Sequence, residues 1–429
     1  MILEFIVKNF ASFKDEICLS FEAKKKKIQG HETNIIVMPD GTKIIRFLSL
    51  YGRNASGKSN LIAAYENMTT FWLWRPQSSS MPINGFVPFR FDTETVTKSC
   101  HFELKFYVDG LKYWYLLDVN SKEVESESLY YYTSTRKKML FDRTTIEGIT
   151  RIEFNNITDI RPSSLLKKEI NMRCLSNMSV MSALMGVNID IKPIAAVKEW
   201  IRNKVAPFLS INQPELGYTQ TFIDKDDNLR DHLKSVMKEA DFNIVDFVTK
   251  TRRQSVPKEI IPFIERNERI PAEERAEIVS SGGFTLPTIE FIHSVENERG
   301  IETYPLSEEY ESSGTINLVE LESALYIHSK QGGFFYVDEI EHSLHPALIK
   351  YVIEKFIDEK DNDAQLLIAT HYTPLLDEVD SLFRSDSIWF TDKGKNGSTS
   401  IYPLYCEKGS QRFNSFQAAY LEGLFKRLI

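Results

Sequence analysis

The feature that most constrains the fold is the loop at residues 52–59, which reads Gly-Arg-Asn-Ala-Ser-Gly-Lys-Ser. Its two glycines lack the Cβ atom that would hold the backbone away from a ligand, so successive N–H groups can turn toward phosphate oxygens. Lys58 can reach the β- and γ-phosphates, and the Ser59 hydroxyl can complete the coordination of a magnesium ion. The residues predicted to bind a nucleotide here are Gly52, Arg53, Asn54, Ala55, Ser56, Gly57, Lys58, Ser59 and Asn60.

The residues around this loop have the pattern of a strand followed by a helix. Residues 47–51 are apolar and predict a buried strand, and residues 60–65 open a helix whose N-terminus favours anions. This context favours a phosphate-binding loop over an ordinary glycine turn, which is the alternative interpretation.

Composition limits the class of protein. The chain has 429 residues, enough for two or three domains, and 42% of them are hydrophobic, enough for sizeable cores. The 52 basic and 60 acidic side chains give a net charge of −8, so any contact with nucleic acid has to be local. The best basic run is four lysines at residues 24–27, interpreted either as a solvated loop or as a binding patch.

Cysteine spacing and hydropathy favour a cytoplasmic protein. The four cysteines are scattered and form no Cys-x-x-Cys pair, which argues against a zinc site or a disulfide framework. The N-terminus lacks the charged and apolar regions of a secretion signal, and no stretch approaches 18 apolar residues. We therefore expect a reducing compartment and no association with a membrane.

Residues 1–150 are expected to form the N-terminal half of a nucleotide-binding head. Residues 1–22 look like two short strands, and three prolines prevent one continuous helix over residues 69–91. Residues 101–119 predict a hairpin around an Asp-Gly turn, and strands at 126–132 and 138–143 continue it as an antiparallel meander. Its tyrosines are interpreted as sheet packing, with a base-stacking platform as the alternative.

Residues 151–283 are predicted to be a helical insertion. Asp338, where the next motif lies, is 279 residues beyond Ser59, more than a compact nucleotide fold needs. No heptad repeat persists, so we expect a compact lid or partner-docking lobe and not a coiled-coil arm. Helices are expected at 163–171, 181–185, 195–204, 229–240, 260–265 and 272–279, with Met172, Met178, Met181 and Met185 as core filler or an adaptable binding surface.

Residues 284–429 are expected to form the C-terminal half of the head, with two apolar strands that end in polar side chains. Residues 332–341 form a Walker B arrangement, in which Asp338 can hold magnesium and Glu339 can polarise the attacking water. The alternative is an acidic strand end that caps a helix. The second strand, at residues 366–371, ends in Thr370 and His371.

The order of these parts resembles that of ABC-type ATPases, including the SMC and RecF types. In ABC-type ATPases a histidine placed like His371 senses the γ-phosphate, which implies a catalytic role for His371 beside Glu339. Residues 311–315 stand where such proteins have a Ser-Gly-rich signature that completes the site of the opposite subunit. The resemblance implies that Ser312, Ser313 and Gly314 contact nucleotide in a sandwich dimer, although three customary residues are replaced; a simple helix N-cap is the alternative.

The motifs as a set closely resemble bacterial AAA-type ATP-binding proteins of the RloA-like and abortive-infection group. The set is Asn9-Phe10, 52–59, Pro88-Phe89, 311–315, 338–341, 344–346, Thr370-His371 and 420–423. The implied fold is an α/β ABC-type P-loop NTPase head, a mixed sheet plus an antiparallel β-meander, with a helical insertion lobe. ATP and Mg²⁺ are the implied cofactors. A homodimer or higher homo-oligomer would form through the ATP site and control a separate effector, a nuclease, in antiphage defence.

Two other functions stay open. The first is an ATP-gated DNA clamp for repair, as in RecF-like proteins, for which DNA would be the partner; a phage protein is a further candidate partner. The second, the ATP-hydrolysing subunit of a transporter, is disfavoured by the Asn9-Phe10 opening and the insertion. Only 58 residues follow His371, too few for a fused Toprim nuclease. One departure from the family pattern is the coupling glutamine, because Gln77 comes too early and Pro88-Phe89 occupies the expected position.

Overall fold

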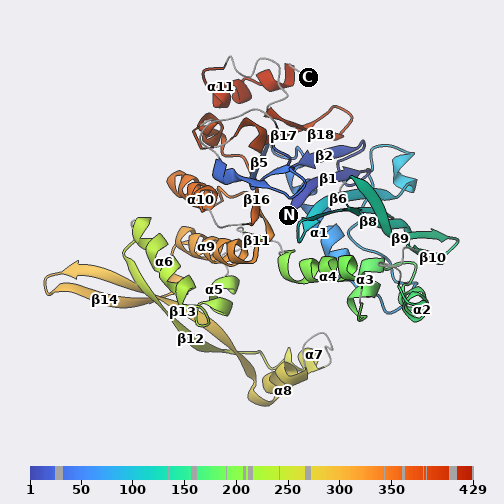
Figure 1. Cartoon of the computed structure of the whole chain (residues 1–429). Helices are drawn as coiled ribbons and strands as arrows, with labels where there is room; N and C mark the ends of the chain where they lie inside the picture. Colours follow the sequence, from blue (N-terminus) through green and yellow to red (C-terminus); the bar gives the residue numbers. More distant parts are fainter. Residues whose placement is uncertain are drawn as a thin grey trace. The chain divides into compact units, whose positions relative to one another are not determined.

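The chain folds into two compact units in its computed structural model (Figure 1). Unit 1 comprises Met1–Asn212, His328–His342 and Ile349–Ile429, and unit 2 comprises Gln213–Ile327 and Ser343–Leu348. The structure describes residues 1–24, 32–133, 135–155, 162–189, 191–205, 209–210, 216–240, 242–265, 272–342, 344–359, 363–379, 381–382, 384–404 and 413–427. Most of the lysine run at 24–27, and Cys406, lie outside these residues.

A six-stranded sheet in unit 1 follows the phosphate-loop strand. Its order is β11-β15-β16-β5-β17-β18, with β18 antiparallel and the other strands parallel. All residues of β5 and β16 are buried, as expected for parallel strands covered on both faces. The three strands predicted around 47–51, 332–341 and 366–371 are confirmed. The bounds are β5 (Phe47–Gly52), β11 (Leu209–Ser210), β15 (Phe334–Asp338), β16 (Gln365–Thr370), β17 (Ile388–Lys393) and β18 (Thr399–Pro403).

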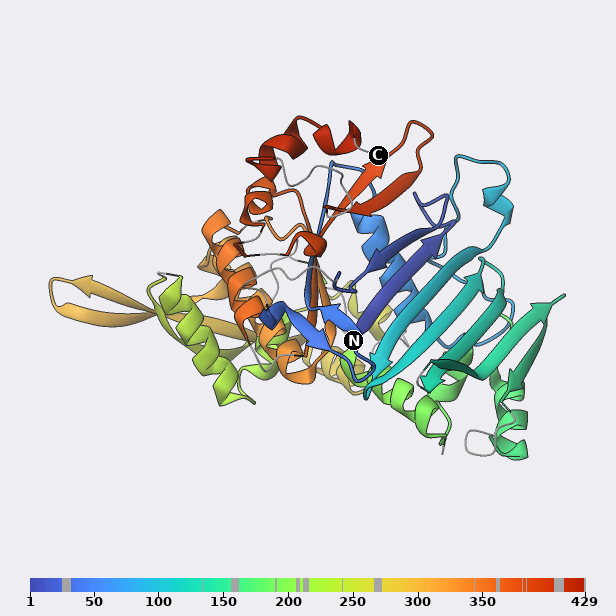
Figure 2. The ribbon, with the colours of Figure 1, turned by 45° about the horizontal axis from the view of Figure 1, so that its top comes forward.

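The second sheet of unit 1 is the predicted antiparallel meander, with the order β10-β9-β8-β7-β6-β1-β2. Figure 2 shows its strands side by side as one broad sheet. Asp109 (φ 49°) and Gly110 (φ 76°) are both left-handed, as a two-residue hairpin turn requires. Its strands are β1 (Ile2–Lys8), β2 (Ile17–Ser20), β6 (Cys100–Val108), β7 (Leu111–Val119), β8 (Val124–Thr133), β9 (Arg136–Ile146) and β10 (Ile149–Phe154).

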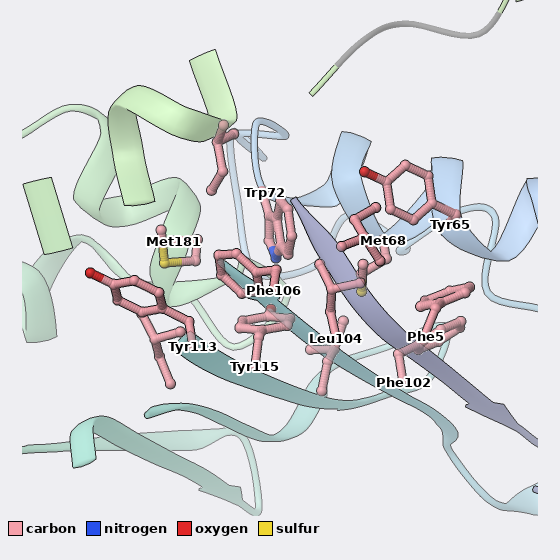
Figure 3. Close-up of a cluster of buried hydrophobic side chains, with 14 of the residues drawn as sticks. Phe5, Tyr65, Met68, Trp72, Phe102, Leu104, Phe106, Tyr113, Tyr115 and Met181 are labelled. Atoms are coloured by element: carbon pink, nitrogen blue, oxygen red, sulfur yellow. The ribbon is translucent and has the colours of Figure 1, made fainter. Parts of the chain in front are cut away.

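Helix α1 (Lys58–Phe71) contributes to the hydrophobic core that joins the two sheets (Figure 3). The Tyr65 ring lies 5.7 Å from Phe5 of the meander and 4.8 Å from Phe334 of the parallel sheet, measured between centroids. At the end of the same helix the Trp72 ring meets Tyr115 edge-on at 5.1 Å. The helix that begins at the phosphate loop is therefore fixed by packing on both sides.

Shorter elements complete unit 1. Met178, Met181 and Met185 are buried as core filler, whereas Met172 is 74% exposed and does not belong to the core. The elements are β3 (Ile35–Val37), β4 (Lys43–Ile45), α2 (Ser164–Arg173), α3 (Val180–Met185), α4 (Lys192–Lys204), α10 (Pro346–Asp358), α11 (Phe416–Leu421) and 3-10 helices at Glu32–Asn34, Thr95–Thr97, Thr373–Glu378, Ser385–Ser387 and Leu424–Arg427. The first three residues of α10 are counted in unit 2.

Unit 2 combines helices with a three-stranded antiparallel sheet of order β12-β13-β14. Of the helices predicted for residues 151–283, three lie in unit 2 and three in unit 1. The prediction of a helical insertion misses β12, which pairs with β13 from Ile244 opposite His293 to Ser255 opposite Gly283. The elements are α5 (Gly217–Phe222), α6 (Asp227–Glu239), β12 (Ile244–Ser255), α7 (Ile261–Glu265), α8 (Ala272–Ser281), β13 (Gly283–Asn297), β14 (Gly300–Ser307), a 3-10 helix at Glu308–Tyr310 and α9 (Ser313–Gln331), of which the last four residues are counted in unit 1.

Candidate nucleotide-binding site

The loop between β5 and α1 has the backbone shape of an anion cradle. Ala55 (φ 61°) and Gly57 (φ 111°) are left-handed, and the N–H of Ser56 donates to the carbonyl of Arg53 at 3.0 Å. Alternation between right-handed and left-handed residues gathers N–H groups on one side of a loop. Because Gly57 is also the N-cap of α1, the free N–H groups of the first helical turn add to the same site.

Neighbouring side chains also leave no room for a Cβ atom at the two glycines of the loop. A Cβ atom added to Gly52 would lie 2.0 Å from Thr391 Oγ1, and one added to Gly57 would lie 2.6 Å from Thr399 Oγ1. The sequence suggests close approach of a ligand as the reason for these glycines. The structure supplies a second reason, because the hairpin of β17 and β18 packs closely against the loop.

Lys58 and His371 meet although 313 positions separate them. The Lys58 ammonium donates to the Gly52 carbonyl at 3.0 Å and to Nε2 of His371 at 2.7 Å. Burial lowers the pKa of Lys58, with Asp338 and Glu341 opposing that effect, and burial followed by the charge of Lys58 lowers the pKa of His371. A neutral His371 that accepts at Nε2 carries its proton on Nδ1.

Asp338 and Ser59 form a donor set that fits a magnesium ion. Asp338 ends β15, accepts a hydrogen bond from the Ser59 hydroxyl, and has its pKa raised by burial. Its Oδ1 atom is buried and contacts no hydrogen-bond donor within the described residues. Such an oxygen needs a partner, and carboxylate and hydroxyl oxygens are ligands that Mg²⁺ accepts alongside phosphates and water. No cluster of three or more His, Cys, Asp or Glu side chains in the described part of the chain could hold a metal by itself.

Glu339 adopts a left-handed conformation directly after the strand. Its φ is 54°, and its N–H donates to the carbonyl of Ala369 at 2.9 Å. Left-handed backbone is unfavourable for a glutamate, so the surrounding structure has to hold it. The hydrogen bond keeps Glu339 beside the end of β16, the strand that His371 follows.

Glu341 fixes the turn that carries His371. One carboxylate oxygen accepts the Thr370 hydroxyl at 2.6 Å, and the other accepts the backbone N–H of His371. The carboxylate therefore binds two donors at the end of the neighbouring strand. Sequence reasoning assigns Glu341 no role; the only available signal is its place in the Asp-Glu-Ile-Glu run.

The Asn9-Phe10 motif connects two segments of the chain through the hydrogen bonds of Asn9. The Asn9 amide donates to the carbonyls of Thr95, Lys98 and Ser99 at 2.9–3.1 Å, and its oxygen accepts the N–H of Phe89 at 3.1 Å. Asn9 itself is left-handed, with φ 52°, which asparagine tolerates better than most residues. The motif thus anchors the segment in which Pro88-Phe89 takes the place of the expected coupling glutamine.

The signature residues lie in unit 2, at the start of the 19-residue helix α9. Ser312 precedes the helix, and its hydroxyl accepts the N–H of Thr315 at 3.0 Å, so the predicted N-cap is present. Ser313 is exposed and Gly314 is half-buried in the first turn.

Comparison with known proteins places these features in a family. The family model described as "AAA domain, putative AbiEii toxin, Type IV TA system" matches residues 47–378. Similar solved structures include an SMC head domain from Thermotoga maritima, with 12% sequence identity and a TM-score of 0.37. This match covers 94% of the present chain and 98% of the SMC head chain. An Smc head domain from Pyrococcus furiosus, with an extended coiled coil and bound to the C-terminal domain of ScpA, has 13% identity, 99% coverage of both chains and a TM-score of 0.41. No curated protein matches the sequence.

Proposed function

We propose that this chain, which belongs to the family of AAA domains described as putative AbiEii toxin of a type IV TA system, binds ATP with Mg²⁺ and hydrolyses it. The observation that carries the proposal is the contact between Lys58 and His371 at 2.7 Å, at the same edge of the parallel sheet where β15 ends in Asp338. Ligands of open α/β sheets bind at this carboxyl edge.

Each residue has a distinct task in the proposed reaction. The loop N–H groups and Lys58 bind the phosphates, and Ser59 and Asp338 would hold the magnesium ion, which neutralises charge on the β- and γ-phosphates. Glu339 polarises the attacking water. His371 lies against Lys58 and would contact the γ-phosphate that Lys58 binds.

We further propose that the complete site needs two copies of the chain. Ser312, Ser313 and Gly314 form the N-terminal end of α9, where unsatisfied N–H groups and the helix dipole favour an anion. In the proposed homodimer they contact the γ-phosphate bound by the loop of the opposite copy. The exposure of Ser313 is consistent with this task.

The proposed role of this ATPase is control of a separate effector, a nuclease, in antiphage defence. The support is the family description, which names a putative AbiEii toxin and a type IV TA system. We propose the reducing cytoplasm as its compartment, since Cys18, Cys100 and Cys174 are free thiols. No described helix has the length and apolar character needed to span a bilayer.

The substitution Glu339→Gln tests the hydrolytic part. It removes the carboxylate that polarises water but keeps the side-chain volume, so we expect the ATPase rate to fall about a hundredfold or more while ATP binding stays within about twofold. Phosphate release and equilibrium binding of a fluorescent ATP analogue measure the two quantities. Turnover at the wild-type rate would exclude Glu339 as the base. Purification of the native protein, with identification of a co-purifying nuclease, tests the effector.

A second candidate function, an ATP-gated DNA clamp, is favoured by one surface of the meander. Lys137 Nζ lies 4.2 Å from the ring centroids of both Trp114 and Tyr130, and Lys112 lies 5.6 Å from that of Tyr132. Lysines beside partly exposed aromatic rings are typical of single-strand binding surfaces. Salt-sensitive DNA binding that requires ATP would support this candidate.

A further inference from the structure

Four buried hydroxyl groups, one of them in the phosphate loop itself, connect the loop to the β17–β18 hairpin and to the turn between β1 and β2. Thr391 of β17 contacts the Ser56 hydroxyl at 2.5 Å, measured between the two Oγ atoms, and Thr399 of β18 donates to the Ser56 carbonyl at 2.8 Å. Ser12, in the turn between β1 and β2, lies 2.9 Å from the Thr399 hydroxyl and accepts from the Asn60 amide at 2.8 Å. All four hydroxyl-bearing residues are at most 7% exposed.

The hydroxyl hydrogen of Thr399 faces two acceptors. Thr399 donates to the Ser56 carbonyl at 2.8 Å and to the Ser12 oxygen at 2.9 Å. The Ser12 oxygen also accepts from the Asn60 amide, whereas the Ser56 carbonyl, which can only accept, has Thr399 as its hydroxyl donor. In the neighbouring pair, Thr391 donates to the carbonyl of Tyr51 at 3.3 Å.

The hydrogen bond from Thr399 to the Ser56 carbonyl controls the direction of one N–H group. In a trans peptide the carbonyl oxygen and the following N–H point in opposite directions. When Thr399 holds the Ser56 carbonyl, the N–H of Gly57 has to point away from the hairpin. Gly57 is the N-cap of α1 and has a left-handed φ of 111°, so its peptide has conformational freedom that a neighbour must remove.

We propose that Thr399 is a positioning residue that holds the Ser56–Gly57 peptide with the Gly57 N–H directed at the β-phosphate of bound nucleotide. The inference rests on the proposed function and adds a residue from a distant segment to the site. Thr399 contributes preorganisation, because the peptide does not have to turn when phosphate arrives. ATP and ADP gain equally, since both carry the β-phosphate.

The test uses Thr399→Val, which keeps the shape of the side chain and removes the donor. With fluorescent analogues of ATP and ADP, we expect both dissociation constants to rise about tenfold, the effect of one lost hydrogen bond to a buried carbonyl. KM for ATP should rise to the same extent, with kcat within about twofold. Thr399→Ser restores the donor and should bind both nucleotides within about twofold of the wild-type protein.

The matched control is Thr145→Val. Thr145 is also buried, at 7% exposed, and its hydroxyl contacts Thr150 and Arg143 in the meander. Loss of this hydroxyl should lower thermal stability but leave both dissociation constants unchanged. Ser12→Ala removes the acceptor that shares the Thr399 hydrogen and leaves the bond to the Ser56 carbonyl, so both dissociation constants should stay within about twofold of the wild-type values. Thr399→Ala, which also lacks the donor, serves as the deciding variant if Thr399→Val does not fold.

The outcomes separate this inference from the proposed function. A wild-type protein that binds neither analogue overturns the proposed function. A wild-type protein that binds both, with folded Thr399→Val or Thr399→Ala of unchanged affinity, overturns the positioning role alone. Equal losses in Thr399→Val and Thr399→Ser would also overturn it, because the donor would then not be the group that matters.

Discussion

At the scale of single residues, the carboxylate of Glu341 shows how the chain orients a group that it does not use directly. It binds the Thr370 hydroxyl and the His371 N–H, both in the turn after β16. An amide in its place has one oxygen acceptor and an NH₂ group that would face one of the two donors. A Glu341→Gln variant would therefore release the turn that carries His371.

We expect Glu341→Gln to lower kcat about tenfold or more, with ADP affinity within about twofold, because the phosphate loop keeps its own contacts. Steady-state ATPase kinetics and ADP titration provide the measurement. His371→Ala is the matched comparison, and the double variant should be no slower than it, since Glu341 acts through His371. Additive losses would show that Glu341 contacts the reacting groups itself.

At the scale of elements, His101 of β6 and Asp118 of β7 make the meander sensitive to pH. The His101 ring contacts Asp118 at 2.7 Å and Glu103 at 3.1 Å, while Lys8 of β1 lies opposite it in the register. Burial opposes protonation, but the two carboxylates outweigh it and raise the pKa of His101 to about 9. The ordinary value is about 6.5.

Because the folded pKa is the higher one, protonated His101 adds stability that is complete below about pH 6.5 and disappears as the pH rises through about 9. After allowance for partial exposure, the contribution is about 2 kcal/mol. Denaturant unfolding of the wild-type protein and of His101→Gln between pH 6 and 10 measures it. We expect the difference in unfolding free energy to shrink toward high pH; a constant difference would refute the assigned pKa.

The elements also show what a single sequence can reveal. The strands β5, β15 and β16 are short apolar runs, and β6 and β7 alternate around an Asp-Gly turn, so local pattern predicts them. Strand β12 escapes prediction because its second half, Lys-Thr-Arg-Arg-Gln-Ser, is exposed and has no apolar alternation. Its pairing with β13 is what makes it a strand.

The candidate site likewise contains residues that a local sequence pattern predicts and residues that it does not. Lys58, Asp338 and His371 stand at the ends of recognisable strands or at the start of a helix, so their meeting is predictable from the carboxyl-edge rule. Thr399 is unexceptional in sequence, and 343 positions separate it from Ser56. Only the approach of β18 to the loop gives it a role, and no local pattern encodes that approach.

At the scale of the whole molecule, the division into units gives the dimer hypothesis its test. The loop, Asp338 and His371 belong to unit 1, whereas the signature residues Ser312–Gly314 belong to unit 2. If two copies share each nucleotide, ATP should drive dimer formation, and a variant that binds ATP without hydrolysing it should trap the dimer. Light scattering of Glu339→Gln with ATP and with ADP tests this, and we expect a dimer with ATP only.

Ser313→Arg addresses the interface itself. The bulky side chain at the exposed start of α9 would occupy the space intended for the γ-phosphate of the opposite copy, so dimer formation and hydrolysis should both be lost, while binding of ATP to the single chain stays within about twofold. Ser280→Arg adds the same side chain to an exposed position near the end of α8 and should change neither property. If Ser313→Arg hydrolyses ATP at the wild-type rate, α9 does not reach a nucleotide, and each copy must complete its site with residues of its own.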